Sequence, residues 1–229
     1  MSESTELKDK HRSRFMAFYG DLPPDFLPWN LLQPAEGSRW TVSHWVDNLL
    51  ALFPRDTIPP KLRLRKGLSF QPPRFLFGWA MSSDVLFNIA QRHNFLPPDT
   101  PPDCNPRALY WKEMVLPLNA VLRKQFPEIM ARLPGYALIT PVMTAGWSYH
   151  QCIVLTDSYA TGNSRPSLAD INTIKDFLGI GEGSTQALAD NQAKWWLDYG
   201  QTAWEYMDSR QFDAISRPWL KEVRQLHSK

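Results

Sequence analysis

The sequence predicts an α+β fold in which a small, mainly antiparallel sheet is covered by several helices. Three observations lead to this class: strand patterns are few, two of them form a hairpin, and they do not alternate with helical patterns as a doubly wound parallel sheet requires. Hydrophobic residues make up 43% of the 229 residues, which is enough apolar material for a core. We therefore expect one α+β domain over residues 21–229, preceded by a polar N-terminal segment, 1–20.

Helical and alternating patterns define the first half of the chain. Apolar residues recur at helical spacing up to Phe53, and residues 61–66 alternate between basic and aliphatic side chains as a strand does. The expected elements are a short helix at 14–19, a helix at 41–53, strands at 61–66 and 74–79, and a helix at 82–94. The proline-rich stretch 96–106 is expected to be a lid or a linker.

A hairpin is the clearest feature of the second half. Two strand-like runs, 136–143 and 147–155, flank a three-residue loop that ends in Gly146. Ser167 and Asp170 have capping-box spacing, and a glycine stop signal follows at residue 179. The expected helices are 107–133, interrupted at Pro117 and Pro127, then 167–178, a long helix from 184 or 185 to about 208, and a short one at 217–226.

Charge and motif content argue against several classes of function. The chain carries 25 Lys and Arg against 23 Asp and Glu, a net charge of +2, whereas nucleic-acid binding usually needs a dense basic patch. The sequence lacks the glycine-rich phosphate-binding, zinc-protease and CxxC motifs, and it has no complete nucleophile elbow. We therefore predict no nucleic-acid partner, no metal site and no catalytic residue.

The compartment is predicted from targeting signals and cysteine usage. The first residues are polar and acidic, unlike a signal peptide, and no apolar run approaches the length of a membrane span. Two cysteines, Cys104 and Cys152, cannot build a disulfide framework. These observations predict a cytoplasmic protein without a membrane span.

Aromatic residues are the most informative feature for function, because ten tryptophans are unusual for this length. Several of them fall within the expected helix 185–208, and one face of a helix cannot hold them all. Small-molecule sites are lined mainly by aromatic and aliphatic side chains with a few polar anchors. We therefore predict a non-enzymatic binding protein that encloses an elongated apolar or conjugated small molecule between this helix and the hairpin. No cofactor is identified beyond such a non-covalent ligand.

The predicted ligand-binding residues combine these aromatic side chains with a basic or histidine anchor for a polar or carboxylate end. They are Trp79, Trp111, Trp147, Tyr149, His150, Trp195, Trp196, Tyr199, Trp204, Arg63 and Arg65. Three alternatives stay open. In the first, the tryptophans fill a helix-rich core and the basic residues are solvated. In the second, the chain is a small transferase or hydrolase that uses His150 and Cys152 on one strand face. In the third, surface tryptophans form a protein-interaction module, such as a homodimer.

Motifs over residues 130–200 add a resemblance. They are a strand in which aliphatic residues follow Cys152, the helix start Arg165-Pro166-Ser167, a Leu-Gly stop at 178–179, and Trp195-Trp196-Leu197-Asp198. In these motifs the chain resembles a group of small proteins from mushroom-forming (basidiomycete) fungi, and the resemblance extends to polyene-binding pigment proteins. The resemblance implies a non-covalent polyene ligand and carries over no catalytic residue.

Overall fold

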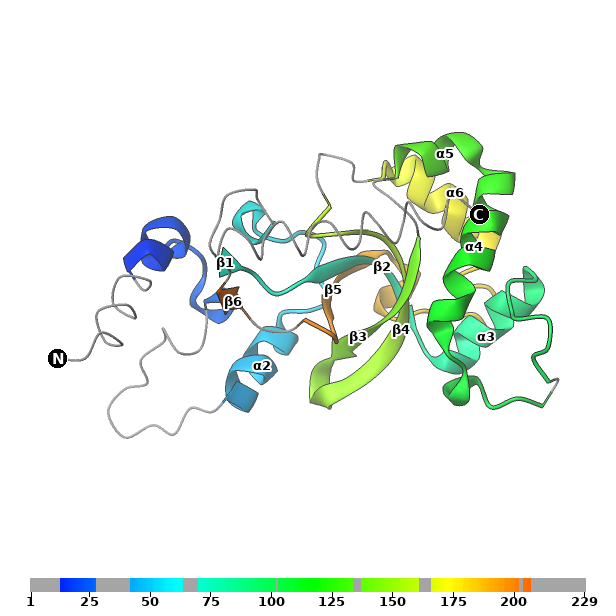
Figure 1. Ribbon diagram of the computed structural model, residues 1–229, viewed down its shortest axis with the longest axis horizontal. Helices are drawn as coiled ribbons and strands as arrows, with labels where there is room; N and C mark the ends of the chain where they lie inside the picture. Colours follow the sequence, from blue (N-terminus) through cyan, green and yellow to red (C-terminus); the bar gives the residue numbers. More distant parts are fainter. Residues whose placement is uncertain are drawn as a thin grey trace.

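Four antiparallel strands form a closed sheet at the centre of the molecule in the computed structural model (Figure 1). In the order in which they are hydrogen-bonded they are β2 (Phe75–Met81), β4 (Ser148–Asp157), β3 (Leu138–Thr144) and β5 (Lys194–Asp198), and β5 pairs again with β2. The structure describes residues 13–27, 42–63, 70–101, 103–133, 137–160, 166–201 and 204–206. The predicted α+β class with a small antiparallel sheet is confirmed, and the sheet is closed rather than open.

The predicted hairpin is confirmed as β3 and β4. Their register runs from Leu138 opposite Val154 to Thr144 opposite Ser148. The connecting turn, η5 (Ala145–Trp147), contains Gly146 at φ 73°, a left-handed conformation that glycine adopts without steric cost. This turn lets the chain reverse within three residues.

Closure of the sheet buries both of its faces. Side chains alternate along a strand, so Phe77 and Trp79 of β2 point outward into the larger hydrophobic cluster, while Leu76 and Ala80 point inward. The inner cluster is small and also holds Val142, Cys152, Val154 and Trp196. Burial on both faces explains why every residue of β2 is buried.

The helices cover the outer face of the sheet. α3 (Ser83–Arg92), α4 (Val115–Gln125), α5 (Pro127–Arg132) and α6 (Leu168–Leu178) gather on one side of the sheet, and α2 (Val42–Ala51) lies on the other side, beside the hairpin end (Figure 1). Local signals set their ends as expected. Ser167 Oγ accepts a hydrogen bond from the Asp170 amide at the start of α6, and Gly179 at φ 65° ends it.

The remaining elements are short. They are η1 (Pro24–Phe26), η2 (Pro60–Leu62), η3 (Pro106–Ala108), η4 (Trp111–Met114), η6 (Ala189–Asn191), and β1 (Phe70–Gln71) paired with β6 (Glu205–Tyr206). Residues 13–19 are helical, as expected for 14–19, and their Phe15 and Tyr19 are buried in the larger cluster. The described part of the 96–106 stretch consists of turns and irregular backbone up to η3, and its role as a lid stays a prediction.

Two sequence predictions are wrong, the first in its described part. Residues 61–62, where a strand was expected over 61–66, belong to η2, because Pro59 and Pro60 hold φ near the value of a helical turn. Residues 64–66 lie outside the described residues. The long helix expected from 184 or 185 to 208 is replaced by η6, β5 and β6 in its described part. The helix expected at 217–226 lies outside the described residues.

In the part of the chain that the structure describes, no helix has both the length and the hydropathy that a bilayer crossing requires.

Candidate functional site

The sequence predicts a pocket between an aromatic helix and the hairpin, but residues 194–198 of that helix form strand β5. Trp195 and Trp196 are consecutive in this strand and therefore point to opposite faces of the sheet. The Trp195 ring lies 5.3 Å from that of Phe77 in the outer cluster. The Trp196 ring lies in the inner cluster, where its Nε1 donates to the Gly78 carbonyl oxygen at 3.0 Å. These two indoles cannot line one pocket.

Three further tryptophans of the predicted site are part of the larger core. Trp79 and Trp111 are buried in it, at 0% and 6% exposure. Trp204 packs edge-on against Phe15 and donates from Nε1 to the Phe26 carbonyl oxygen at 2.8 Å. For these residues the core-filling interpretation fits the structure better than ligand contact.

Of the two predicted arginine anchors, the structure describes only Arg63. Arg63 directly follows η2 and is half-buried. The neighbouring Lys61 joins η2 to the N-terminal helical segment through the Phe18 carbonyl and the Asp21 carboxylate. Arg65 lies outside the described residues.

Trp147, Tyr149 and Tyr199, three of the predicted site residues, are exposed near the hairpin end, and we call them the aromatic surface. They are 49%, 62% and 54% exposed. The centroids of the Tyr149 and Tyr199 rings are 5.9 Å apart at an interplanar angle of 53°. Trp147 donates from Nε1 to Oδ1 of the exposed Asp47 in α2 at 2.7 Å. Large apolar surface is thus displayed at one place.

Local structure places each ring of the aromatic surface. Trp147 ends the hairpin turn with φ 60°, and Tyr149 stands opposite Met143 on the outer side of the sheet. Tyr199 follows β5 directly, and its amide donates to the Pro141 carbonyl at 3.2 Å. A strand that ends beside the hairpin therefore adds the third ring.

His150 and Cys152 share the inner face of β4, as their spacing predicts, but they form no activated pair. His150 Nδ1 lies 3.2 Å from Thr144 Oγ1, and burial lowers the histidine pKa. Burial raises the pKa of the Cys152 thiol well above its ordinary value, and the Asp198 charge adds to this effect. A thiol in this state stays protonated near neutral pH, so it lacks the thiolate that nucleophilic catalysis needs.

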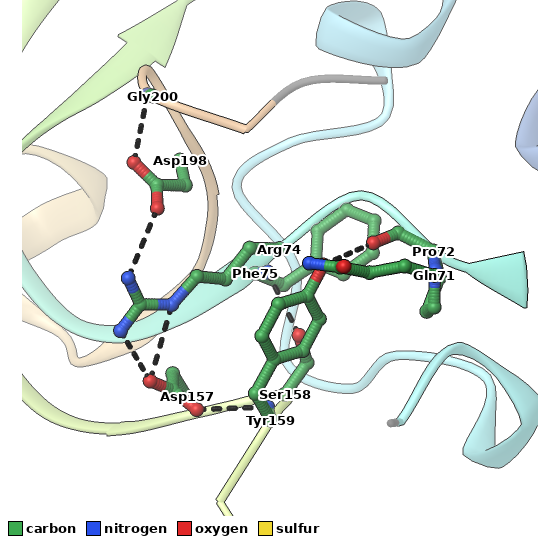
Figure 2. Close-up of polar contacts among 9 residues, drawn as sticks. All are labelled: Gln71, Pro72, Arg74, Phe75, Asp157, Ser158, Tyr159, Asp198 and Gly200. Carbon is green, nitrogen blue, oxygen red and sulfur yellow. Dashed lines mark hydrogen bonds and ion pairs between the residues drawn. The ribbon is translucent and has the colours of Figure 1, made fainter. Parts of the chain in front are cut away.

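A buried charge cluster, which the sequence analysis missed, joins the ends of three strands (Figure 2). Arg74 precedes β2, whereas Asp157 and Asp198 are the last residues of β4 and β5. Arg74 donates from Nη2 and Nε to Asp157 Oδ2 at 2.5 and 3.2 Å, and from Nη1 to Asp198 Oδ2 at 3.4 Å. We call these three residues the arginine cluster.

Burial and charge act against each other in the arginine cluster. Burial disfavours the Arg74 charge, but the two carboxylates together raise the pKa of Arg74. Burial raises the pKa of Asp198, and the charge of Asp157 adds to this rise, while Arg74 opposes it. Two carboxylates share a single guanidinium, so one negative charge is left over when both are ionised.

Backbone groups complete the arginine cluster (Figure 2). The amides of Tyr159 and Gly200 donate to the remaining Oδ1 atoms of Asp157 and Asp198 at 2.8 and 2.9 Å. Ser158 exchanges two hydrogen bonds with the Phe75 backbone. Every carboxylate oxygen thus has a donor within the protein, so the arginine cluster holds the strand ends together.

Sequence signals for the missed features are weak. Asp157 and Asp198 each stand where a strand meets a turn, a common place for aspartate, and nothing local indicates that both meet Arg74. Among the described residues no group of three or more His, Cys, Asp or Glu side chains could hold a metal ion.

No family model, curated protein or solved structure matches this chain. The resemblance to fungal proteins and the cytoplasmic location therefore stay predictions.

Proposed function

We propose that the protein is a non-enzymatic binding protein that holds an elongated apolar or conjugated small molecule on the aromatic surface. The observation that carries this proposal is the grouping of three large, roughly half-exposed rings at the hairpin end. Single exposed hydrophobic residues are ordinary, whereas several large exposed rings at one end of a sheet, two of them in contact, are typical of an interaction site. A polyene is one member of the proposed ligand class, and the resemblance in sequence favours it.

The size of the aromatic surface sets the expected affinity. A ligand that covers the exposed half of three aromatic side chains buries roughly 300 Å² of protein surface. At about 25 cal/mol per Å² this contributes about 7 kcal/mol before the cost of association is subtracted. We therefore expect a dissociation constant in the micromolar range or weaker.

Diphenylhexatriene tests the proposal, because this neutral conjugated probe fluoresces when it leaves water for an apolar surface. We expect a saturable signal with the native protein and a loss of affinity of about tenfold or more in the double variant Tyr149→Ser/Tyr199→Ser. Tyr110→Ser is the matched control, because Tyr110 is 60% exposed outside the aromatic surface. Absence of saturable binding, or equal binding by the double variant, would contradict the proposal.

Two alternatives compete with it. A small enzyme using His150 and Cys152 is the weaker one, because the thiol is buried and its pKa is raised. A protein interface on the same aromatic surface is the stronger one, because Tyr and Trp are enriched at interface centres. Sedimentation equilibrium separates a homodimer from a small-molecule site: the proposed function predicts a monomer mass at concentrations that bind the probe.

A further inference from the structure

We propose that the ligand of the aromatic surface carries an organic cation, a quaternary or protonated amine, which lies against the rings beside Asp47. This inference rests on the proposed function and assigns the polar end of the same ligand. It reverses the expectation of a basic anchor for a carboxylate end, because the charged groups that the structure places near the rings are acidic.

Asp47 supplies the nearest negative charge. Its Oδ1 accepts the Trp147 Nε1 hydrogen at 2.7 Å, which holds the carboxylate at the edge of the indole, and Asp47 is itself exposed. The face of an aromatic ring attracts cations through its quadrupole, most strongly for tryptophan. A ring with a carboxylate at its edge thus offers two attractions to one cation.

The arginine cluster supplies a second, more distant negative charge. Its two carboxylates exceed its one guanidinium, and Asp198 is bonded directly to Tyr199 in the chain. Low exposure of Asp157 and Asp198 leaves this charge less screened by salt than a surface charge would be. When both carboxylates are ionised, this surplus charge favours a cation over an anion beside Tyr199.

Three of the protein's own cations lie against rings outside the aromatic surface. In the described ranges the cation–π contacts join Arg55 to Phe26, Lys61 to Phe18, and Arg74 to Tyr159. None of these aromatic residues belongs to the aromatic surface. His150, the residue next to Tyr149 in β4, has a pKa lowered by burial and is neutral near pH 7. The three residues of the aromatic surface are each about half exposed, so a cation from outside can reach them.

Three probes with one conjugated core test the inference: diphenylhexatriene, its trimethylammonium derivative and its propionate derivative. We expect the cation to bind about threefold to tenfold more tightly than the neutral probe, and the anion to bind most weakly. The preference should shrink in about 1 M salt, where the Debye length is about 3 Å. Asp47→Asn keeps an oxygen for the Trp147 hydrogen bond and should remove most of the preference for the cation over the neutral probe.

Asp176→Asn is the matched control, since it removes the same charge from an exposed position on α6 and should leave the preference intact. Equal or tighter binding of the neutral or anionic probe would overturn the inference and leave the proposed function standing. A cation preference that survives in Asp47→Asn would overturn it as well. Failure of all three probes to bind saturably would instead contradict the proposed function.

Discussion

Substitution of the two aspartates of the arginine cluster should have unequal effects on stability, although both are buried and both contact Arg74. Asp157 accepts two bonds from the guanidinium, at 2.5 and 3.2 Å, whereas Asp198 accepts one, at 3.4 Å. Asp157→Asn therefore removes the principal charge partner of Arg74. Asp198→Asn removes the surplus charge and keeps an oxygen for the Gly200 amide.

The structure gives a magnitude for each change. Removal of one partner from a buried ion pair costs about 3–5 kcal/mol, and Asp198 still offsets part of this cost, so Asp157→Asn should lower the free energy of unfolding by about 2–3 kcal/mol. Burial and the Asp157 charge oppose ionisation of Asp198. Asp198→Asn should therefore change the free energy of unfolding by less than about 1 kcal/mol at neutral pH.

The pH dependence has a definite sign. The pKa of Asp198 is raised above its unfolded value, so the folded chain binds this proton more tightly than the unfolded chain does. The wild type therefore gains stability from protonation of Asp198 as the pH falls from the folded-state pKa toward the pKa of the unfolded chain. The Asp198→Asn variant has no carboxylate at this position and does not gain this stability. Each pKa unit of difference corresponds to about 1.4 kcal/mol. The lowered pKa values of His93 and His150 act in the opposite direction but cancel between the two proteins.

Urea unfolding at about pH 7.5 and about pH 4.5 measures these effects, with the wild type alongside each variant at each pH. Asp157→Asn should be the less stable variant near neutral pH. Relative to the wild type, Asp198→Asn should lose stability as the pH is lowered. Equal costs for the two substitutions near neutral pH, or a pH-independent difference between Asp198→Asn and the wild type, would refute the reasoning.

Three further predictions concern the sheet, its inner face and one helix. Gly78→Ala should cost about 3 kcal/mol or more in urea unfolding, because a Cβ there would lie 1.9 Å from the Ile153 carbonyl oxygen; unchanged stability would contradict the closed sheet. Cys104, which is partly exposed, should alkylate with iodoacetamide while buried Cys152 reacts only after unfolding, as mass spectrometry of each cysteine peptide would show. Ser167→Ala removes the N-cap of α6 and should cost about 1 kcal/mol in thermal unfolding, whereas Ser167→Asp should retain most of the stability.

Elements with local signals could be predicted from the sequence. The hairpin follows from strand patterns on either side of Gly146, whose left-handed φ the turn requires. The bounds of α6 follow from Ser167 and Gly179, which satisfy backbone groups at its two ends. In each case the residues that determine the structure lie within a few positions of one another.

Elements that depend on distant contacts could not be predicted. In β5 both faces are buried, so Trp195, Trp196 and Leu197 form a continuous apolar run instead of an alternating pattern. Such a run does not distinguish a strand from a buried helix. Asp198 of the arginine cluster and Tyr199 of the aromatic surface are both placed by the end of β5. Because the sequence predicted a helix there, neither feature could be predicted. Of the predicted aromatic site residues, Trp147, Tyr149 and Tyr199 are exposed near the hairpin end.

The central claim is that the aromatic surface is where a ligand binds, and chemical-shift mapping tests it most directly. Proton–nitrogen spectra of the ¹⁵N-labelled protein would be recorded during titration with the trimethylammonium derivative of diphenylhexatriene. The account predicts the largest shifts at the Trp147 indole N–H and at the amides of Tyr149 and Tyr199, with little change at the buried indoles of Trp79 and Trp196. Largest shifts at residues remote from the hairpin end would contradict it.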